Sequence, residues 1–178
     1  MAVHSFKKVQ YIPCSLTKAW DFFSSPANLP HLTPKEMDFR IISRFPAARV
    51  YAGQLIEYRL RPLPGLRVYW MTEITHVVAP DGSGEPVGMA ADAYFVDEQR
   101  RGPYSLWHHQ HHFKEVAGGI EMADIVHYQL PLGFLGDWVD SLLVKGQLEG
   151  IFRYRFQQVE TFFGKWTGPT PATETLAV

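Results

Sequence analysis

The sequence contains a single cysteine, Cys14, among 178 residues. One thiol excludes a disulfide within the chain and any zinc cluster built from cysteines. Cys14 also lacks an activating motif, so we expect a small buried hydrophobic residue rather than a nucleophile. Any chemistry that this chain performs has to use other side chains.

An excess of charge of one sign is also missing, since the formal net charge is −1. Nucleic acids and anionic membranes attract strongly basic proteins, so neither is an expected partner. No apolar run approaches the roughly 20 residues that span a bilayer. The first ten residues lack the basic and apolar regions of a secretory signal. The sequence therefore predicts a cytoplasmic protein without membrane insertion, and no motif indicates a cofactor.

Aromatic residues are abundant, at 14% of the chain, beside 46% hydrophobic and 20% charged residues. This balance favours a globular protein with a large core or an apolar cavity. The length suits one domain, which we expect to span residues 1–164. Residues 165–178 are small, polar and proline-bearing, which predicts a disordered tail.

The order of predicted elements indicates an α+β fold. A strand at residues 3–12 precedes a helix at 16–24, with Ser15 as N-cap, and a short helical turn at 27–32. Further strands are predicted at 39–45, 54–61, 67–78, 91–98, 105–116 and 120–130, and a long helix at 134–163. We expect a curved antiparallel sheet of about six or seven strands wrapped around the C-terminal helix. A ligand would occupy the gap near the open end of this sheet.

The stretch from Phe95 to Phe113 is the most distinctive part of the chain. It reads as two strands around a Gly102-Pro103 turn, and four histidines lie between Trp107 and Phe113. Side chains of a strand alternate between faces, which divides the histidines into two pairs. The inner face carries Trp107, His109, His111 and Phe113, and the outer face carries Leu106, His108, Gln110 and His112.

Turn positions predict which residues face one another across the strands. A turn at 117–118 places His111 opposite Asp124, and it also sets His109 against Val126 and Trp107 against Tyr128. A turn at 100–103 places Phe95 near Trp107. Alternation on the two earlier strands adds the following companions on the inner face: Ile56, Tyr58, Leu60, Trp70, Thr72 and Ile74.

The inner histidines admit several interpretations. His111 and Asp124 form a satisfied buried pair, or together with His109 they form the polar end of a ligand pocket. Alternatively Asp124 orients His111 as a general base. A metal site is not expected, because no third histidine is clearly on this face.

Other polar residues near the hairpin receive structural or open assignments. We expect the outer pair, His108 and His112, to be solvated, with a surface metal or partner patch as the alternative. Asp97 and Gln99 are expected to hydrogen-bond the turn at 100–102. Arg67 or Arg101 would be able to reach an anionic group at the cavity mouth, and the sequence selects neither.

The order of elements resembles the helix-grip fold of START domains, birch-pollen allergens and polyketide cyclases, the SRPBCC superfamily. The pattern Phe95-x-Asp-x-Gln-x-x-Gly-Pro-Tyr-x-x-Trp-x-His-x-His-x-Phe113 is similar to that of a bacterial SRPBCC subfamily, as is Met122-x-Asp-x-Val-x-Tyr-x-Leu-Pro131. Members stand alone without an assigned activity or are fused to nucleotide-sugar epimerase-like domains described as cell-division inhibitors. The superfamily also includes carriers, cyclases and hydrolases, so the resemblance implies a fold rather than one function.

Together these observations predict binding of a small, largely apolar molecule, of lipid-like or polyketide-like character. The alternatives are a cyclase, dehydratase or hydrolase that uses His111 and Asp124 in catalysis, and a protein-interaction module without an open cavity. Ligand identity, catalysis and oligomeric state remain open. The predicted ligand-binding residues are Trp70, Phe95, Trp107, His109, His111, Phe113, Met122, Asp124, Tyr128, Trp138 and Leu142.

Overall fold

The computed structural model describes residues 2–44, 47–63, 65–84, 91–131 and 144–169. Helical segments are α1 (Leu16–Phe23), η1 (Pro26–Asn28), α2 (Leu29–Leu32), η2 (Lys35–Met37) and α4 (Lys145–Phe163). Strands are β1 (His4–Ile12), β2 (Arg40–Ile41), β3 (Gln54–Leu63), β4 (Leu66–Val78), β5 (Ala93–Arg101), β6 (Leu106–Val116) and β7 (Gly119–Gln129). The predicted α+β architecture is confirmed.

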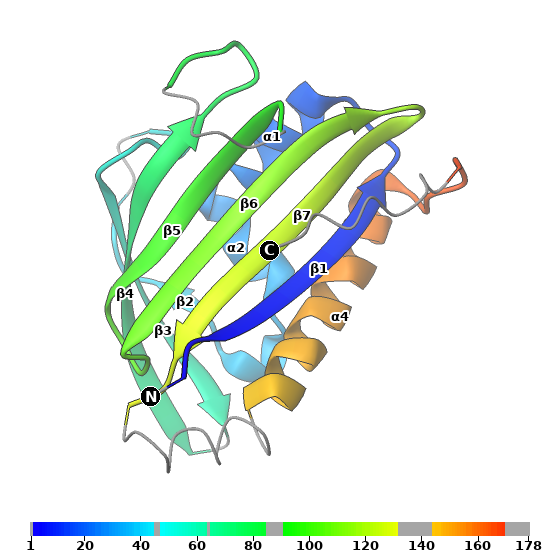
Figure 1. Ribbon diagram of the computed structural model, residues 1–178. Helices are drawn as coiled ribbons and strands as arrows, with labels where there is room; N and C mark the ends of the chain where they lie inside the picture. The colour runs from blue at the N-terminus through cyan, green and yellow to red at the C-terminus, as the bar shows by residue number, and fades with distance from the viewer. Residues whose placement is uncertain (1, 45–46, 64, 85–90, 132–143, 170–178) are drawn as a thin grey trace.

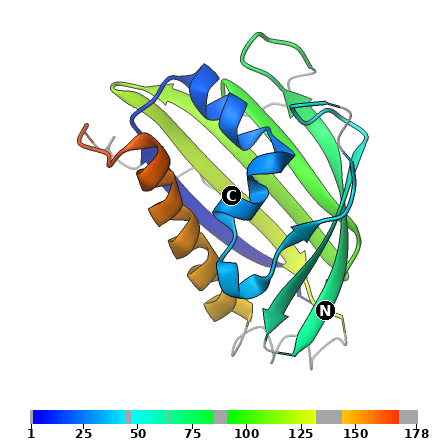
Figure 2. The ribbon, with the colours of Figure 1, turned by 180° about the vertical axis from the view of Figure 1, so that it is seen from behind.

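The strands form one seven-stranded sheet in the order β1-β7-β6-β5-β4-β3-β2. Every neighbouring pair is antiparallel. The sheet curves strongly, and α1, α2 and α4 lie on its concave side (Figures 1 and 2). None of the described helices is long and apolar enough to cross a membrane.

Helix α1 closes one end of the concave face. The Ser15 side chain accepts a hydrogen bond from the Lys18 backbone amide, as expected of an N-cap. The buried face of the helix includes Trp20, whose ring contacts Phe95 and Phe113 at centroid distances of 6.0 and 5.9 Å. These aromatic contacts make this end of the sheet a solid core.

Helix α4 covers the concave face beside β1, to which the Gln10 side chain joins it by a 3.1 Å hydrogen bond to the Phe156 carbonyl. Its buried residues belong to two separate groups. Val159 packs into the core beneath α1, whereas Leu148 and Phe152 pack with Phe6 and other residues at the far end of β7. A cavity lies between these residues of α4 and strands β3 to β6.

Several predicted boundaries change in the structure. The strand expected at 39–45 is reduced to β2, because the Ile42 and Ser43 amides both bond the Glu57 carbonyl, at 2.8 and 3.3 Å, and end the regular ladder.

The predicted start of the long helix, with Trp138 and Leu142, lies outside the described residues. The Trp166 ring packs against Tyr11 at 5.5 Å. Residues 170–178 lie outside the described part, so the disordered tail stays a prediction.

Candidate ligand cavity and its histidine–aspartate cluster

A cavity of about 220 Å³ lies between the concave face of the sheet and helices α2 and α4. Strands β3 to β6 form one wall, and the opposite wall includes Leu32 of α2 and Leu148, Ile151 and Phe152 of α4. Most lining side chains are apolar or aromatic. Polar side chains gather mainly at one place, where Asp97, His109, His111 and Arg155 reach the cavity.

Five of the predicted ligand-binding residues line this cavity: Trp70, Phe95, Trp107, His109 and His111. The companions predicted on β3 and β4 line it too: Ile56, Tyr58, Leu60, Thr72 and Ile74. The other predicted residues within the described part are buried on the same face but outside the lining: Phe113, Met122, Asp124 and Tyr128. Phe113 and Met122 belong to the core beneath α1, and Tyr128 packs near Phe6 and Phe152.

The predicted register of β6 and β7 is confirmed, with His111 opposite Asp124 and His109 opposite Val126. The predicted register of β5 and β6 is wrong. Phe95 lies opposite His111, and their rings stack at 4.2 Å, whereas Trp107 lies further along β6. The cause is the turn, which was expected at 100–103 but follows a β5 strand that continues to residue 101.

Gln99 bonds this turn as predicted, although its partner is Tyr104 and not a residue of 100–102. Its side-chain amide donates to the Tyr104 carbonyl at 2.6 Å and accepts from the Tyr104 amide at 3.2 Å. Asp97 does not share that role, and its predicted contact with the turn is wrong. In the observed register Asp97 faces His109, which places its carboxylate on the concave side of the sheet.

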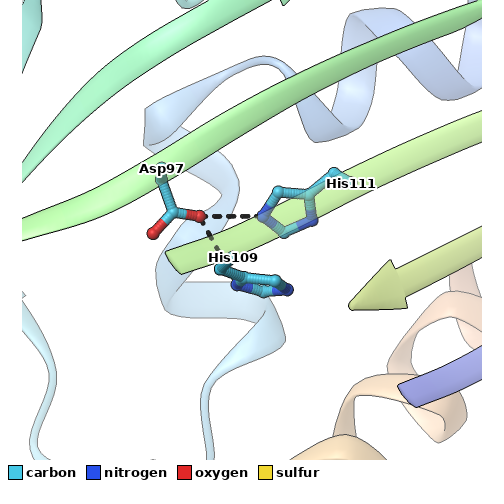
Figure 3. A group of neighbouring side chains, drawn as sticks. All are labelled: Asp97, His109 and His111. Carbon is cyan, nitrogen blue, oxygen red and sulfur yellow. Dashed lines mark hydrogen bonds and ion pairs between the residues drawn. The ribbon is translucent and has the colours of Figure 1, made fainter. Parts of the chain in front are cut away.

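Two aspartates and two histidines contact one another in a closed group. The Asp97 Oδ2 atom lies 3.0 Å from His111 Nε2 and 3.4 Å from His109 Nδ1 (Figure 3). The opposite nitrogens face Asp124, whose Oδ1 atom lies 2.8 Å from His111 Nδ1 and 3.1 Å from His109 Nε2. Each ring is therefore held between one carboxylate on β5 and one on β7.

Arg155 of α4 completes the group and was missed by the sequence reasoning. Its Nη2 atom lies 3.3 Å from Asp124 Oδ1, and its guanidinium lies 5.5 Å from the Phe23 ring and 5.7 Å from the Phe152 ring. The sequence did contain a signal. Arg155 follows Phe152 by three residues and precedes Val159 by four, so it interrupts the buried stripe of the helix.

The charges of this group determine where protons reside. Burial opposes the ionisation of Asp124, but Arg155 and hydrogen bonds from both histidines outweigh it and hold the pKa well below its usual range. Burial and the neighbouring His111 lower the pKa of His109. Burial also opposes the protonation of His111, but hydrogen bonds to Asp124 and Asp97 prevail and raise its pKa. His111 is thus the protonated member of the pair and His109 the neutral one.

The outer pair has a different environment from the one predicted. His112 is only 7% exposed and stacks on Tyr94 at 5.5 Å, so the expectation of a solvated side chain is wrong for it. Gln110 lies between the two rings, 2.9 Å from His108 Nε2 and 2.9 Å from His112 Nε2. Burial lowers the pKa of His112 to about 4.

The two candidate arginines lie elsewhere. Arg67 pairs with Asp38 at 3.3 Å, and Arg101 lies 5.5 Å from the Tyr69 ring; neither lines the cavity. Among the described residues, Asp97, His109 and His111 form a group that offers three possible metal-ligand atoms within 4.8 Å of one another. The prediction that no metal site is present did not count Asp97.

Solved structures identify the architecture. A START superfamily protein from Mycobacterium smegmatis aligns with a TM-score of 0.59 and 14% identity, over 89% of this chain and 99% of that one. The major latex-like protein 151 of Panax ginseng aligns with a TM-score of 0.60 and 9% identity, over 90% and 97% of the two chains. The fold is the helix-grip fold.

A third structure, from Thermus thermophilus, aligns with a TM-score of 0.59 and 16% identity over 89% of this chain and 99% of that one. No protein-family model matches the sequence, and no curated protein matches it either. The predicted likeness to START and latex-like proteins is confirmed at the level of the fold. Identities this low carry no information about a particular ligand.

Proposed function

We propose that the chain binds a small, largely apolar molecule in the cavity between the sheet and α4. The observation that carries this proposal is the combination of an apolar wall and one polar group in the same cavity. Pockets of this composition orient a ligand through a few polar contacts while apolar contacts supply most of the affinity. A protein-interaction module would not need such an interior.

The size of the cavity limits the ligand. Pockets for drug-sized molecules have volumes of about 300–1,000 Å³. The cavity of about 220 Å³ is smaller, so we expect a ligand of correspondingly few atoms, such as a short acyl chain or one or two fused rings. Trp70 and Trp107, whose rings cross at 90° with centroids 5.1 Å apart, provide flat apolar surface for it.

The charges at the polar end favour an oxygen-bearing ligand. Arg155 reaches the cavity from α4 with N–H donors, and the Asp97 acceptor lies on the facing strands beside the protonated His111. A carboxylate or an enolisable carbonyl would accept hydrogen bonds from the donors. We therefore propose a short apolar body that ends in a carboxylate or carbonyl oxygen.

Native mass spectrometry of the purified full-length protein tests the proposal, followed by calorimetry of the chelator-treated protein with octanoate and 1-octanol. We expect a bound small molecule or octanoate binding, with octanol weaker because it lacks the carboxylate. Ile151→Trp fills the cavity from α4 and should weaken octanoate binding about tenfold or more, equivalent to about 1.4 kcal/mol.

Gln157→Trp is the matched control, because Gln157 is an exposed residue of the same helix outside the cavity lining. It should leave octanoate binding unchanged. A clean apo mass together with no binding of either probe to the wild-type protein would contradict the proposal. Equal weakening by both tryptophans would place the probe outside the cavity.

A second candidate is acid–base catalysis, which the 2.8 Å contact between His111 Nδ1 and Asp124 favours. A carboxylate on one ring nitrogen fixes the imidazole and supports proton transfer at the other, which in His111 lies beside Asp97 at the cavity wall. Turnover of the co-purified molecule that disappears in His111→Gln, with the fold retained, would support an enzyme. Retention of the molecule without turnover would support a carrier.

A further inference from the structure

The two ring nitrogens of His109 each contact a carboxylate. Nε2 lies 3.1 Å from Asp124 Oδ1, and Nδ1 lies 3.4 Å from Asp97 Oδ2, in a site where these side chains are largely buried. With its single N–H on Nε2 toward Asp124, a neutral His109 would present the lone pair of Nδ1 on the side of Asp97. A cation between Nδ1 and Asp97 Oδ2 would be attracted by both atoms.

His111 offers its second nitrogen to the same point. Its Nε2 atom lies 3.0 Å from the same Asp97 oxygen, and the three atoms all lie within 4.8 Å of one another. A metal with bonds of about 2.1 Å separates neighbouring ligand atoms by about 3.0 Å in an octahedron and about 3.4 Å in a tetrahedron. The two measured separations from Asp97 Oδ2, 3.0 and 3.4 Å, fall in this range.

Asp124 has the position of an outer-shell partner. Metal-bound histidines usually donate the N–H of their other ring nitrogen to a carboxylate, which fixes the ring orientation. Both nitrogens that face away from Asp97 contact Asp124 Oδ1, at 2.8 and 3.1 Å. Arg155 in turn contacts Asp124 at 3.3 Å and holds it in place. Each histidine therefore has one ring nitrogen in contact with Asp124 and the other close to Asp97 Oδ2.

We propose that Asp97 Oδ2, His109 Nδ1 and His111 Nε2 bind one divalent transition-metal ion of the iron, cobalt and zinc group at the cavity wall. Two imidazoles and one carboxylate are the ligand set of open sites for such ions, whereas magnesium and calcium prefer oxygen ligands. The ligands come from two adjacent strands, β5 and β6 (Figure 3). The turn that Gln99 bonds joins these strands.

The remaining coordination positions face the cavity, because all three ligand residues line it and Asp124 does not. The ion displaces the proton that His111 carries in the metal-free protein, so the two aspartates and Arg155 leave a formal charge of −1, which the divalent ion raises to +1. An anionic oxygen on the ion restores neutrality. The ion site itself does not depend on the proposed function; only its coordination of a cavity ligand does.

The test uses the full chain, freed of metal with a chelator, and titrates it with cobalt chloride alone. We expect one cobalt ion per chain, with the visible absorption of cobalt bound to nitrogen and oxygen in an open site. Asp97→Asn should abolish this absorption, and Asp97→Glu should restore part of it. Asp124→Asn should weaken cobalt binding about 10- to 100-fold, because it removes the outer-shell carboxylate. Magnesium chloride should not compete.

The outer face of β6 provides the matched control. The double variant His108→Asn/His112→Asn removes two histidines from the same strand and should bind cobalt as the wild type does. Unfolding curves identify any variant that does not fold. If a variant does not fold, zinc is added to the folded wild-type protein instead. The ring signals of His109 and His111 should then shift in NMR spectra, and those of His108 and His112 should not.

Three results would overturn the proposal. The first is a wild-type protein that retains no more cobalt than magnesium. The second is a folded Asp97→Asn variant with undiminished cobalt binding. The third is loss of the cobalt absorption in a folded outer double variant. None of them bears on octanoate binding by the metal-free protein, so the failure of this proposal and of the proposed function are distinguishable.

Discussion

Strand β6 carries an inner and an outer histidine pair, and the two have opposite environments. On the concave face His109 and His111 lie between Asp97 and Asp124. On the convex face Gln110 lies between His108 and His112, and the carboxylate that contacts this pair, Glu98, reaches only His108, at 2.9 Å. Both faces of β6 carry a histidine pair, but only on the concave face do carboxylates contact both histidines.

The difference shows that neighbouring strands, and not the histidines alone, decide what such a pair can do. Asp97 and Asp124 are contributed by β5 and β7, so the inner pair requires three correctly registered strands. The outer pair is bonded mainly through Gln110 of its own strand. An amide bonds neutral histidines well but does not stabilise a positive charge as a carboxylate does.

The largest effect is expected from Asp124→Ala. This variant leaves Arg155 and the protonated His111 buried without the carboxylate that both contact. Breaking a buried ion pair by removing one partner costs about 3–5 kcal/mol. Urea denaturation at neutral pH should show that loss in the free energy of unfolding. A loss below about 1 kcal/mol would mean that the inner cluster contributes no more than a surface pair does.

The free energy of unfolding, measured over a range of pH, tests the environment of His112 in the outer pair. The folded pKa of His112 is about 4, below its ordinary value of 6.5, so the stability that neutral His112 contributes is present above pH 6.5 and is lost as the pH falls toward 4. The full difference is on the order of 3 kcal/mol. His112→Phe keeps a ring against Tyr94 and should reduce the loss of unfolding free energy over this range in metal-free protein.

His111 should behave in the opposite sense. Its folded pKa is raised, so its contribution is present below pH 6.5 and is lost as the pH rises through the folded pKa. His111→Gln should therefore lessen the loss of stability on the alkaline side and leave the acid limb in place. If His112→Phe changed the alkaline limb instead, the assignment of the two environments would be reversed.

The smallest effect is expected from Glu98→Gln on the convex face. Glu98 contacts His108 and Arg100, each at 2.9 Å, in partly exposed positions. Pairs of this kind contribute about 0–1 kcal/mol because water and salt screen them. Unfolding curves at low and high salt should differ little from wild type. A loss comparable with that of Asp124→Ala would remove the distinction between the faces.

The sequence predicted the fold and the β6–β7 half of the cluster. Alternation on β6 and a short glycine turn were sufficient to place His111 against Asp124. Local patterns also identified α1, its Ser15 cap and the inner positions of β3 and β4, which survive the irregularities in the pairing of β4 with β5.

The missing half depended on interactions over longer distances. Asp97 was misplaced because the position of the β5–β6 turn is set by hydrogen bonds between Gln99 and Tyr104, which residue preferences do not encode. Arg155 approaches Asp124 only because α4 crosses the sheet at that point. The burial of His112 arises from Tyr94 on the adjacent strand.

The turn that Gln99 closes also sets the register on which the cluster depends. Because strand side chains alternate with a period of two, a slip of β5 against β6 by two residues would keep each side chain on its own face. It would nevertheless set Gln99 or Phe95, in place of Asp97, against His109. Relatives whose turn imposes such a slip would retain the fold and the apolar cavity but carry an amide or a phenyl ring at the carboxylate position. The register at this turn is thus a character by which chains with and without the charged cluster can be sorted.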